Sequence, residues 1–446
     1  MRLSILTLSI IHMVACGGSP SKKDPASIKM TQGERVSPFA PPSASTASPK
    51  ARTRAQTSPK ENVPIPTKET TKTVPAKREP ISISLTFGGD ISLNRSGQKP
   101  RSKGTGTGKN LTPWRDVTGG IIPFFKDSDL NFGNVETVVT PRNIKTRTRK
   151  KYTFQSHVAG FEYLITAGLN LLSLANNHSF DFGEQGARIT LETFRQLKEK
   201  YPEINYAGLG IGEAQAAAPV IFQVKGKTIA FAAVGIISNM NLAHRTGPNK
   251  AGTLRFRDDQ DYQLVINALK SVSADYKILS IHYGKEREVN VDAFQKRRFA
   301  KAFNEAGVDL VLGHHAHVVR GIQRRDDGKV GFYGLGNYMM RGARNMGPLP
   351  DAQDYGLFGK LVLKENLSTG RLYAESLTLH PLTEMHWNSR VMDRKNAERR
   401  LNVLNALSRK AFGLEGVVVG IEWGVGRIDF MEPSKESQMK PSSSPP

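Results

Sequence analysis

The chain has 446 residues, 38% of them apolar, which is enough for one large domain or two ordinary ones. Its single cysteine excludes an internal disulfide. The formal net charge of +23 favours encounter with polyanions such as nucleic acid, anionic lipid or an acidic polymer, although a basic solvated surface without a specific partner explains it equally well.

The N-terminus resembles a bacterial lipoprotein signal peptide. An apolar run over residues 3–14 follows Arg2 and ends just before Ala15 and Cys16. The run is too short to span a bilayer as a stable helix, and its end resembles a lipobox, in which the cysteine is lipid-modified. We therefore predict a signal peptide and lipobox at residues 1–16, with lipidation of Cys16 anchoring the protein in the membrane, on the periplasmic side or at the cell surface. A plain cleaved signal with a chance cysteine is the alternative.

Residues 17–80 are rich in Pro, Ser, Thr, Ala and Lys and contain few apolar residues. Such a segment cannot bury enough surface to offset the entropy of ordering, so we predict a disordered basic tether. Its cations have two interpretations, contact with anionic headgroups or peptidoglycan, and a solvated spacer. A disordered tail is predicted at residues 431–446.

Between these segments, short apolar runs bounded by glycine and polar residues alternate with helix-like segments, which is typical of an α/β architecture. The runs predict strands at residues 81–87, 130–135, 169–174, 228–234, 276–281, 308–312 and 330–333. Apolar residues at helical spacing predict helices at 187–201, 291–306 and 397–411. We therefore predict one folded α/β domain over residues 81–430.

Two further segments stand out in this domain. Residues 104–108 read Gly-Thr-Gly-Thr-Gly but lack the preceding strand and the spacing of a nucleotide-binding fingerprint, so a flexible loop is predicted. A basic cluster follows a little later, and it reads either as a solvated loop or as an anion-binding one. Its members are Arg142, Lys145, Arg147, Arg149, Lys150 and Lys151.

Five of the predicted strands end in residue types that bind metals. The residues in question are Asp90, Glu136, Asn177, His178, His282, His315 and His317. A single histidine at a strand end is more often structural than a metal ligand. In open α/β sheets, however, ligands bind at the edge where the strands end, so these residues together are stronger evidence for a site than any one of them alone. A mixed carboxylate, amide and imidazole set suits Zn, Mn or Fe better than an all-oxygen calcium site. The sequence thus predicts a metal site.

The order and spacing of these motifs resemble the bacterial capsule-biosynthesis CapA family, which handles poly-γ-glutamate. The motifs are Gly89-Asp90, Asn134-Val135-Glu136, Asn176-Asn177-His178 followed by Asp181, His282 to Glu286, Gly313 to His317 and Gly334 to Tyr338. The resemblance covers roughly residues 81–430. It implies the metallophosphoesterase-like fold, a four-layer α/β sandwich of two facing β-sheets covered by helices.

The resemblance also implies a role for each motif residue. Metal ligation falls to Asp90 and His317 for one ion, to Asn177, His282 and His315 for a second, and to Glu136 as the bridge. His178 would be the general acid, with metal-bound hydroxide as the nucleophile. Glu286 would be a second acid–base group or a further ligand, or would simply pair with Lys285 or Arg287. Asn134 and Asn337 would orient the site through hydrogen bonds.

Ser92 departs from the superfamily pattern, because it stands where a metal-binding histidine is usual. The resemblance therefore implies one or two divalent transition metal ions, with Mn, Zn and Fe not distinguished. His314 is predicted to be structural, and His157 and His244 have no supporting motif.

The implied function is a surface-tethered, metal-dependent hydrolase or transferase acting on an anionic capsular polymer such as poly-γ-glutamate. Two alternatives remain open. A periplasmic phosphodiesterase would use the same ligands, and a non-catalytic lipoprotein would bind the polymer during its export, together with capsule-export partners. No nucleic-acid partner is expected.

Overall fold

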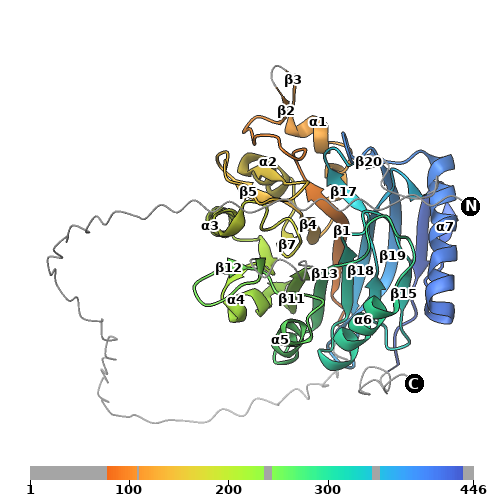
Figure 1. Ribbon diagram of the computed structural model, residues 1–446. Helices are drawn as coiled ribbons and strands as arrows, with labels where there is room; N and C mark the ends of the chain where they lie inside the picture. Colours follow the sequence, from red (N-terminus) through yellow and green to blue (C-terminus); the bar gives the residue numbers. More distant parts are fainter. Residues whose placement is uncertain (1–77, 108–109, 236–243, 344–351, 435–446) are drawn as a thin grey trace, which may run out of the picture. The chain divides into compact units, whose positions relative to one another are not determined.

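The computed structural model describes residues 78–107, 110–235, 244–343 and 352–434 (Figure 1). The predicted signal peptide, nearly all of the predicted tether and most of the predicted tail lie outside these ranges and stay predictions. Among the described residues, no helix is both long enough and apolar enough to cross a membrane.

The larger of two main sheets has ten strands and contains most of the N-terminal half of the domain and its C-terminal part. Along its main path the strands are β21 (Gly420–Glu422), β22 (Val425–Asp429), β19 (Leu372–Thr383), β18 (Gly356–Glu365), β1 (Ser82–Ser92), β4 (Leu130–Val135), β7 (Leu171–Ser173) and β8 (Asn205–Ala207). β17 (Asn337–Met340) pairs with β1, and β20 (Arg390–Val391) pairs with β19. Within this sheet β17, β1, β4, β7 and β8 run parallel to one another. β18 pairs antiparallel with β1, and the neighbouring pairs β18–β19, β19–β22 and β22–β21 are antiparallel as well.

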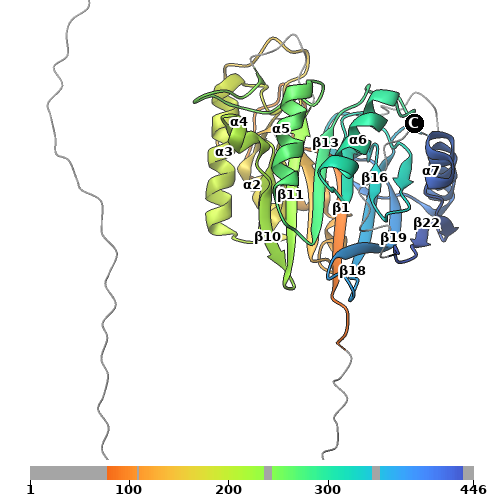
Figure 2. The ribbon, with the colours of Figure 1, turned by 90° about the horizontal axis from the view of Figure 1, so that it is seen from below.

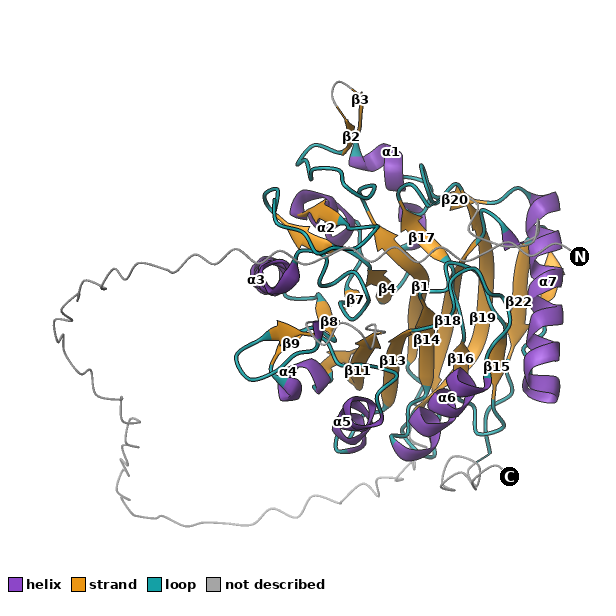
Figure 3. Cartoon of the chain, in the orientation of Figure 1, coloured by secondary structure: helices purple, strands orange, loops and turns teal. Residues whose placement is uncertain are grey.

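The second main sheet has six strands. Their order is β10 (Val220–Val224), β11 (Lys227–Gly235), β13 (Tyr276–His282), β14 (Leu310–His314), β16 (Val330–Phe332) and β15 (Ile322–Arg324). The two sheets face each other across one apolar core (Figure 3). Across it, the rings of Phe87 and Phe332 lie 4.6 Å apart, and those of Phe132 and Phe231 lie 5.9 Å apart.

Helices cover the outer faces of both sheets. The larger sheet is covered by α2 (Val158–Thr166) and α3 (Gly183–Lys200), and the smaller by α5 (Asp259–Lys270) and α6 (Ala293–Glu305). Figure 2 shows α7 (Arg394–Phe412) at the right-hand edge of the sandwich, where it packs on β19, β22 and β15. Asp258, Asp292 and Asp393 begin α5, α6 and α7, because each side chain accepts a hydrogen bond from a backbone amide of the first turn. The predicted α/β sandwich of two facing sheets is confirmed.

The remaining elements are short. They are the helices α1 (Trp114–Thr118) and α4 (Glu213–Ala217), the 3-10 turns Ile122–Phe124 and Gly413–Glu415, and the strand pairs β2 (Thr105–Thr107) with β3 (Asn110–Thr112), β5 (Val138–Thr140) with β6 (Gln155–His157), and β9 (Gly210–Ile211) with β12 (Ala251–Gly252). The loop predicted at residues 104–108 was therefore wrong for Thr105–Thr107. A Cβ on Gly106 would lie 2.0 Å from the Asn110 carbonyl oxygen, so glycine here permits close strand pairing.

Candidate metal centre

The predicted ligands meet where the carboxyl ends of strands from both sheets converge. In the larger sheet Asp90 of β1 lies in register with Asn134 of β4 and with Asn337 of β17. In the smaller sheet His282, the last residue of β13, lies in register with His314, the last of β14. Because parallel strands end at one edge, residues far apart in the sequence come together there.

Glycines let β1 approach β17 closely enough to place Asp90. A Cβ on Gly89 would lie 1.7 Å from the carbonyl oxygen of Gly336, and one on Gly88 would lie 2.4 Å from the ring of Tyr338. The pairing of β1 also shifts register around Asp90. The Gly88-Gly89 pair is therefore required by close packing, and it sets the position of the carboxylate that follows.

Two groups of side chains have the arrangement of a metal site. Glu136, His282 and His315 form one group, and Asp90, Glu136 and His317 form the other, with the ligand atoms of each group within 4.8 Å of one another. All are buried, and Glu136 belongs to both groups. Asn177 lies beside the first group, with its Oδ1 2.7 Å from His282 Nε2. The structure thus brings the six predicted ligands together.

The unpaired atoms of this cluster fit a divalent cation. Neither carboxylate oxygen of Glu136 accepts a hydrogen bond within the described residues, nor does Oδ1 of Asn134, although all three atoms are buried. Three histidine nitrogens lie within 4.0 Å of the Glu136 carboxylate, and a buried carboxylate is strongly unfavourable unless positive charge offsets its own. His315 and His317 also adopt left-handed φ values of 79° and 55°, a strained conformation that is found preferentially at functional sites. The donor set therefore suits one or two metal ions.

Hydrogen bonds hold Asp90 and His317 in place. Asn134 Nδ2 donates to Asp90 Oδ1 at 2.8 Å, and the backbone N–H of His315 donates to Oδ2 at 3.2 Å. His317 Nδ1 lies 3.4 Å from Asp90 Oδ2 and 2.8 Å from Asn337 Oδ1. Both asparagines predicted to orient the site thus contact a predicted ligand.

Burial and mutual charge shift the pKa values of the cluster in opposite directions. Burial, reinforced by the negative charge of Glu136, raises the pKa of Asp90 to about 6. Burial also disfavours the Glu136 carboxylate, but the positive charges of His317 and His282 outweigh it and hold the Glu136 pKa well below its usual range. For His317 burial is likewise outweighed, by Glu136 and Asp90, so its pKa is raised. Burial lowers the pKa of His315 well below the usual histidine value.

His178 is held at the edge of the cluster by Asp181. The Nδ1 atom of His178 lies 2.6 Å from Asp181 Oδ2, and its Nε2 lies 3.9 Å from Glu136 Oε1. Lys150 Nζ donates to Asp181 Oδ1 at 2.6 Å and to the carbonyl oxygen of Asn177 at 2.7 Å. The ring of Phe154 meets the His178 imidazole edge-on, with centroids 4.6 Å apart. The imidazole is therefore fixed with Nε2 toward the predicted ligands.

Two other residues singled out from the sequence lie outside both ligand groups. Ser92 is buried, and its hydroxyl donates to the carbonyl oxygen of Asn94 at 3.2 Å. Glu286 is exposed on the turn after β13, and within the described residues no hydrogen bond or ion pair joins it to the cluster. Its charge nevertheless contributes to the raised pKa of His317.

Three further histidines named in the sequence analysis, His314, His157 and His244, lie in different surroundings. His314 Nδ1 lies 3.8 Å from Asp90 Oδ1, and its ring stacks on Phe132 with centroids 5.4 Å apart. His157 begins α2 by accepting a hydrogen bond from the amide of Ala159. His244 packs on Phe180, with ring centroids 4.8 Å apart. Of these, His314 lies closest to a predicted ligand.

Sequence reasoning missed the support for His178. Asp181 stands three residues after it in the same motif, a spacing that could have indicated a contact. Asn176 accepts a hydrogen bond from the His178 amide at 3.0 Å and donates to the Val135 carbonyl oxygen at 2.7 Å. Lys150 carried no such signal, because its contact depends on the path of the loop before β6.

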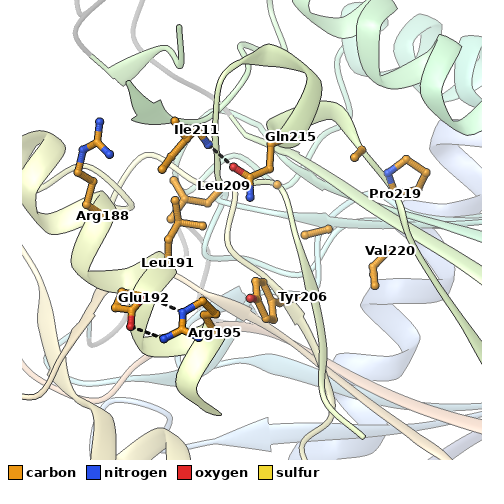
Figure 4. Close-up of a pocket in the computed structure, with 13 residues that line it drawn as sticks. Arg188, Leu191, Glu192, Arg195, Tyr206, Leu209, Ile211, Gln215, Pro219 and Val220 are labelled. Atoms are coloured by element: carbon orange, nitrogen blue, oxygen red, sulfur yellow. Dashed lines mark hydrogen bonds and ion pairs between the residues drawn. The ribbon is translucent and has the colours of Figure 1, made fainter. Parts of the chain in front are cut away.

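A separate pocket of about 530 Å³ lies between α3 and the chain segment that includes β8 and α4. Its lining includes Arg188, Leu191 and Tyr206, and a hydrogen bond joins the Ile211 amide to Gln215 (Figure 4). None of the predicted site residues lines this pocket, so it is no part of the candidate metal centre.

The fold and the cluster define a class of protein, an α/β sandwich with a buried set of carboxylate and histidine side chains that could hold a metal. The chain belongs to the family described as bacterial capsule synthesis protein PGA_cap, whose profile matches residues 84–341. The predicted membership of the CapA family is confirmed.

Relatives with assigned names agree with the family. The PGA biosynthesis protein CapA of Bacillus subtilis (strain 168) is 29% identical over 259 residues, which cover 58% of this chain and 63% of that protein. The capsule biosynthesis protein CapA of Bacillus anthracis is 26% identical over 268 residues, 59% of this chain and 61% of the relative. The chain therefore spans about three fifths of the length of these relatives. Among solved structures, Haemophilus influenzae NAD nucleotidase is 12% identical and has a TM-score of 0.39, covering 75% of this chain and 57% of that chain.

Proposed function

We propose that this protein is a metal-dependent hydrolase or transferase of an anionic capsular polymer, with poly-γ-glutamate as the substrate. The observation that carries the proposal is the buried Glu136 carboxylate, which two groups of candidate ligands share and whose oxygens accept no hydrogen bond within the described residues. The substrate class rests on the family and on the names of the two CapA relatives.

Asp90 and His317 would hold one ion, and His282, His315 and Asn177 the other, with Glu136 between them. When bound, a divalent metal would polarise the scissile group and activate a water molecule. The donor set of imidazole, carboxylate and amide suits Mn, Zn or Fe.

His178 is the general acid in this proposal. Asp181 and Lys150 hold its ring through Nδ1 and through the neighbouring backbone, which leaves Nε2 directed toward the ligand cluster. A proton on Nε2 can then pass to the leaving nitrogen or oxygen of a bond broken there. Phe154 excludes water from one side of the ring, which helps to preserve this orientation.

The location is proposed from the sequence alone, as a lipoprotein held in the membrane through Cys16 and facing the periplasm or the cell surface. There the polymer and its export partners would be within reach. A periplasmic phosphodiesterase remains the nearest rival, since the same side chains would serve it.

To test the proposal, the full chain is purified with Mn²⁺, Zn²⁺ or Fe²⁺ and assayed with two substrates in parallel. Release of glutamate oligomers from poly-γ-glutamate is expected, and it should fall by about 100-fold or more in His178→Ala and in Asp90→Asn. Release of nitrophenol from a nitrophenyl phosphodiester, with no polymer cleavage, would favour the phosphodiesterase. Absence of bound transition metal, together with activity unchanged in both variants, would rule out the metal-dependent mechanism.

A further inference from the structure

The loop between β5 and β6 presents a row of cations beside His178. Residues 145–151 are not helical; residues 145–147 are all exposed, and from Arg147 to Lys151 exposed and partly buried residues alternate. The exposed cations, named here the cationic ladder, are Lys145, Arg147, Arg149 and Lys151. Thr148 and Lys150 between them are partly buried and face the protein. The loop therefore has a cationic outer side and an inner side that contacts the site.

The inner side of the loop is built into the support of His178. Both the amide and the hydroxyl of Thr148 donate to the carbonyl oxygen of Asp181, at 2.9 and 3.1 Å. Lys150 Nζ lies 2.6 Å from Asp181 Oδ1, and the Phe154 amide donates to Oδ2 at 2.7 Å. The same carboxylate therefore positions His178 and pins the loop, which fixes the ladder relative to the candidate general acid.

Within the described part of the chain, Lys145, Arg147 and Arg149 have no acidic partner. Other exposed arginines do: Arg188 pairs with Glu184, for example, and Arg394 with Glu398. Closely spaced like charges repel each other, and in a row without internal counter-charges the binding of an external anion reduces this repulsion. Guanidinium groups recognise carboxylates through two parallel hydrogen bonds.

We propose that the cationic ladder is a polymer-binding subsite, along which an extended polycarboxylate lies so that one of its bonds reaches His178. This subsite rests on the proposed function, and its four cations would be the residues that favour a polymer over a monomer. Residues 145–151 can span up to roughly 20 Å if extended, so a monomer would engage only one cation while a polymer engages several. Affinity should therefore rise with polymer length.

Binding to the full chain tests the subsite, with fluorescein-labelled poly-γ-glutamic acid as the probe, in EDTA so that turnover plays no part. Arg147→Gln/Arg149→Gln should weaken binding by about tenfold and lessen its salt dependence. The matched control Arg297→Gln/Arg427→Gln removes two other exposed arginines and should bind within about twofold of wild type. Arg147→Lys/Arg149→Lys keeps the charge but loses the paired hydrogen bonds, so its affinity should lie between those of wild type and the glutamine variant.

Two results would overturn the subsite: wild-type chain that does not bind the polymer, and a double glutamine variant that binds as tightly as wild type. Both are independent of catalysis. If the ladder variant loses affinity while wild-type enzyme with metal shows no turnover, the subsite stands and the hydrolase proposal fails. If wild type cleaves the polymer and the glutamine variant has an unchanged KM, only the subsite fails.

Discussion

Glu136 is the residue on which both groups of candidate ligands depend. Its carboxylate is fully buried, reached by His282 Nε2 at 3.2 Å on one side and by His317 Nδ1 at 4.0 Å on the other. Replacing it removes a ligand from both groups, whereas Asp90 or His315 belongs to only one. Metal occupancy should therefore be most sensitive at this position.

We predict that Glu136→Gln binds Mn²⁺ or Zn²⁺ more weakly than wild type. The loss of affinity should exceed the roughly 10- to 100-fold that is typical when a residue that only supports a metal ligand is replaced. Metal content after dialysis, measured by plasma mass spectrometry, checks this. Glu286→Gln is the matched control, because Glu286 is exposed on a turn. Equal metal loss in both variants would instead make Glu286 a ligand, as the sequence left open.

The protonation states of the site predict how its metal affinity changes with pH. Asp90, with a pKa raised to about 6, is mostly ionised at pH 7 and takes up a proton below pH 6. The raised pKa of His317 means that a proton also competes with the metal there, whereas His315, with its lowered pKa, stays neutral. Each competing proton costs about tenfold in affinity per pH unit.

Calorimetric titration of the metal-free protein with Mn²⁺ should therefore show affinity falling at least about tenfold between pH 7 and pH 5. Affinity falls toward low pH because protons then occupy Asp90 and His317 and compete with the metal. Proton release on binding, read from buffers of different ionisation enthalpy, is the second readout. An affinity that does not change over this range would contradict the assignment of these two residues as ligands.

The positions of the candidate ligands, and of Asn134 and Asn337 beside them, were predictable from the sequence, whereas the support of His178 was not. His282 ends an apolar strand, Asp90 lies two residues before the end of another and Glu136 directly follows a third; parallel strands bring their carboxyl ends to one edge. Asp181 and Lys150 meet His178 through a loop with no hydrophobic period, so no sequence pattern encodes their contact. Ser92, predicted to depart from the superfamily pattern, donates a hydrogen bond to the Asn94 carbonyl oxygen and lies in neither ligand group.

Among the elements, β1 pairs with three strands, β18, β4 and β17, and it holds Asp90 two residues before its end. We predict that Gly89→Ala lowers the free energy of unfolding by roughly 1–3 kcal/mol and displaces Asp90, since the new Cβ meets the rigid backbone at Gly336. Urea unfolding and metal content would both detect the change.

Gly247→Ala is the matched control, because its Cβ would meet nothing within 4 Å. Its effect on the free energy of unfolding should stay under about 1 kcal/mol. A Gly89→Ala variant as stable as this control, with undiminished metal content, would show that β1 and β17 can separate without loss.

The accuracy of the predicted elements followed their burial. Strands buried on both faces, such as β4 and β13, read as continuous apolar runs and were predicted close to their observed bounds. β18 and β19 were missed, because buried and partly exposed residues alternate along much of each strand and break the apolar run. The helices α3, α6 and α7 were found from their apolar spacing, with ends displaced by one to four residues.

On the scale of the whole molecule, the +23 net charge and the single cysteine bear on where the protein works. One acyl chain gives only marginal membrane binding, and a second signal, such as a further chain or a basic segment, makes it stable. The predicted acylation of Cys16 would supply the first signal, and the basic residues that follow it within residues 17–80 would supply the second.

We predict that the wild-type chain, expressed in a bacterium, partitions into the detergent phase of a Triton X-114 extraction. Cys16→Ser should move it to the aqueous phase and abolish incorporation of labelled palmitate, since no other thiol is present. Ser19→Ala, a nearby conservative change, serves as the control and should leave partitioning unchanged. If Cys16→Ser stays in the detergent phase, Cys16 is not the anchor and the membrane assignment must rest on the basic residues alone.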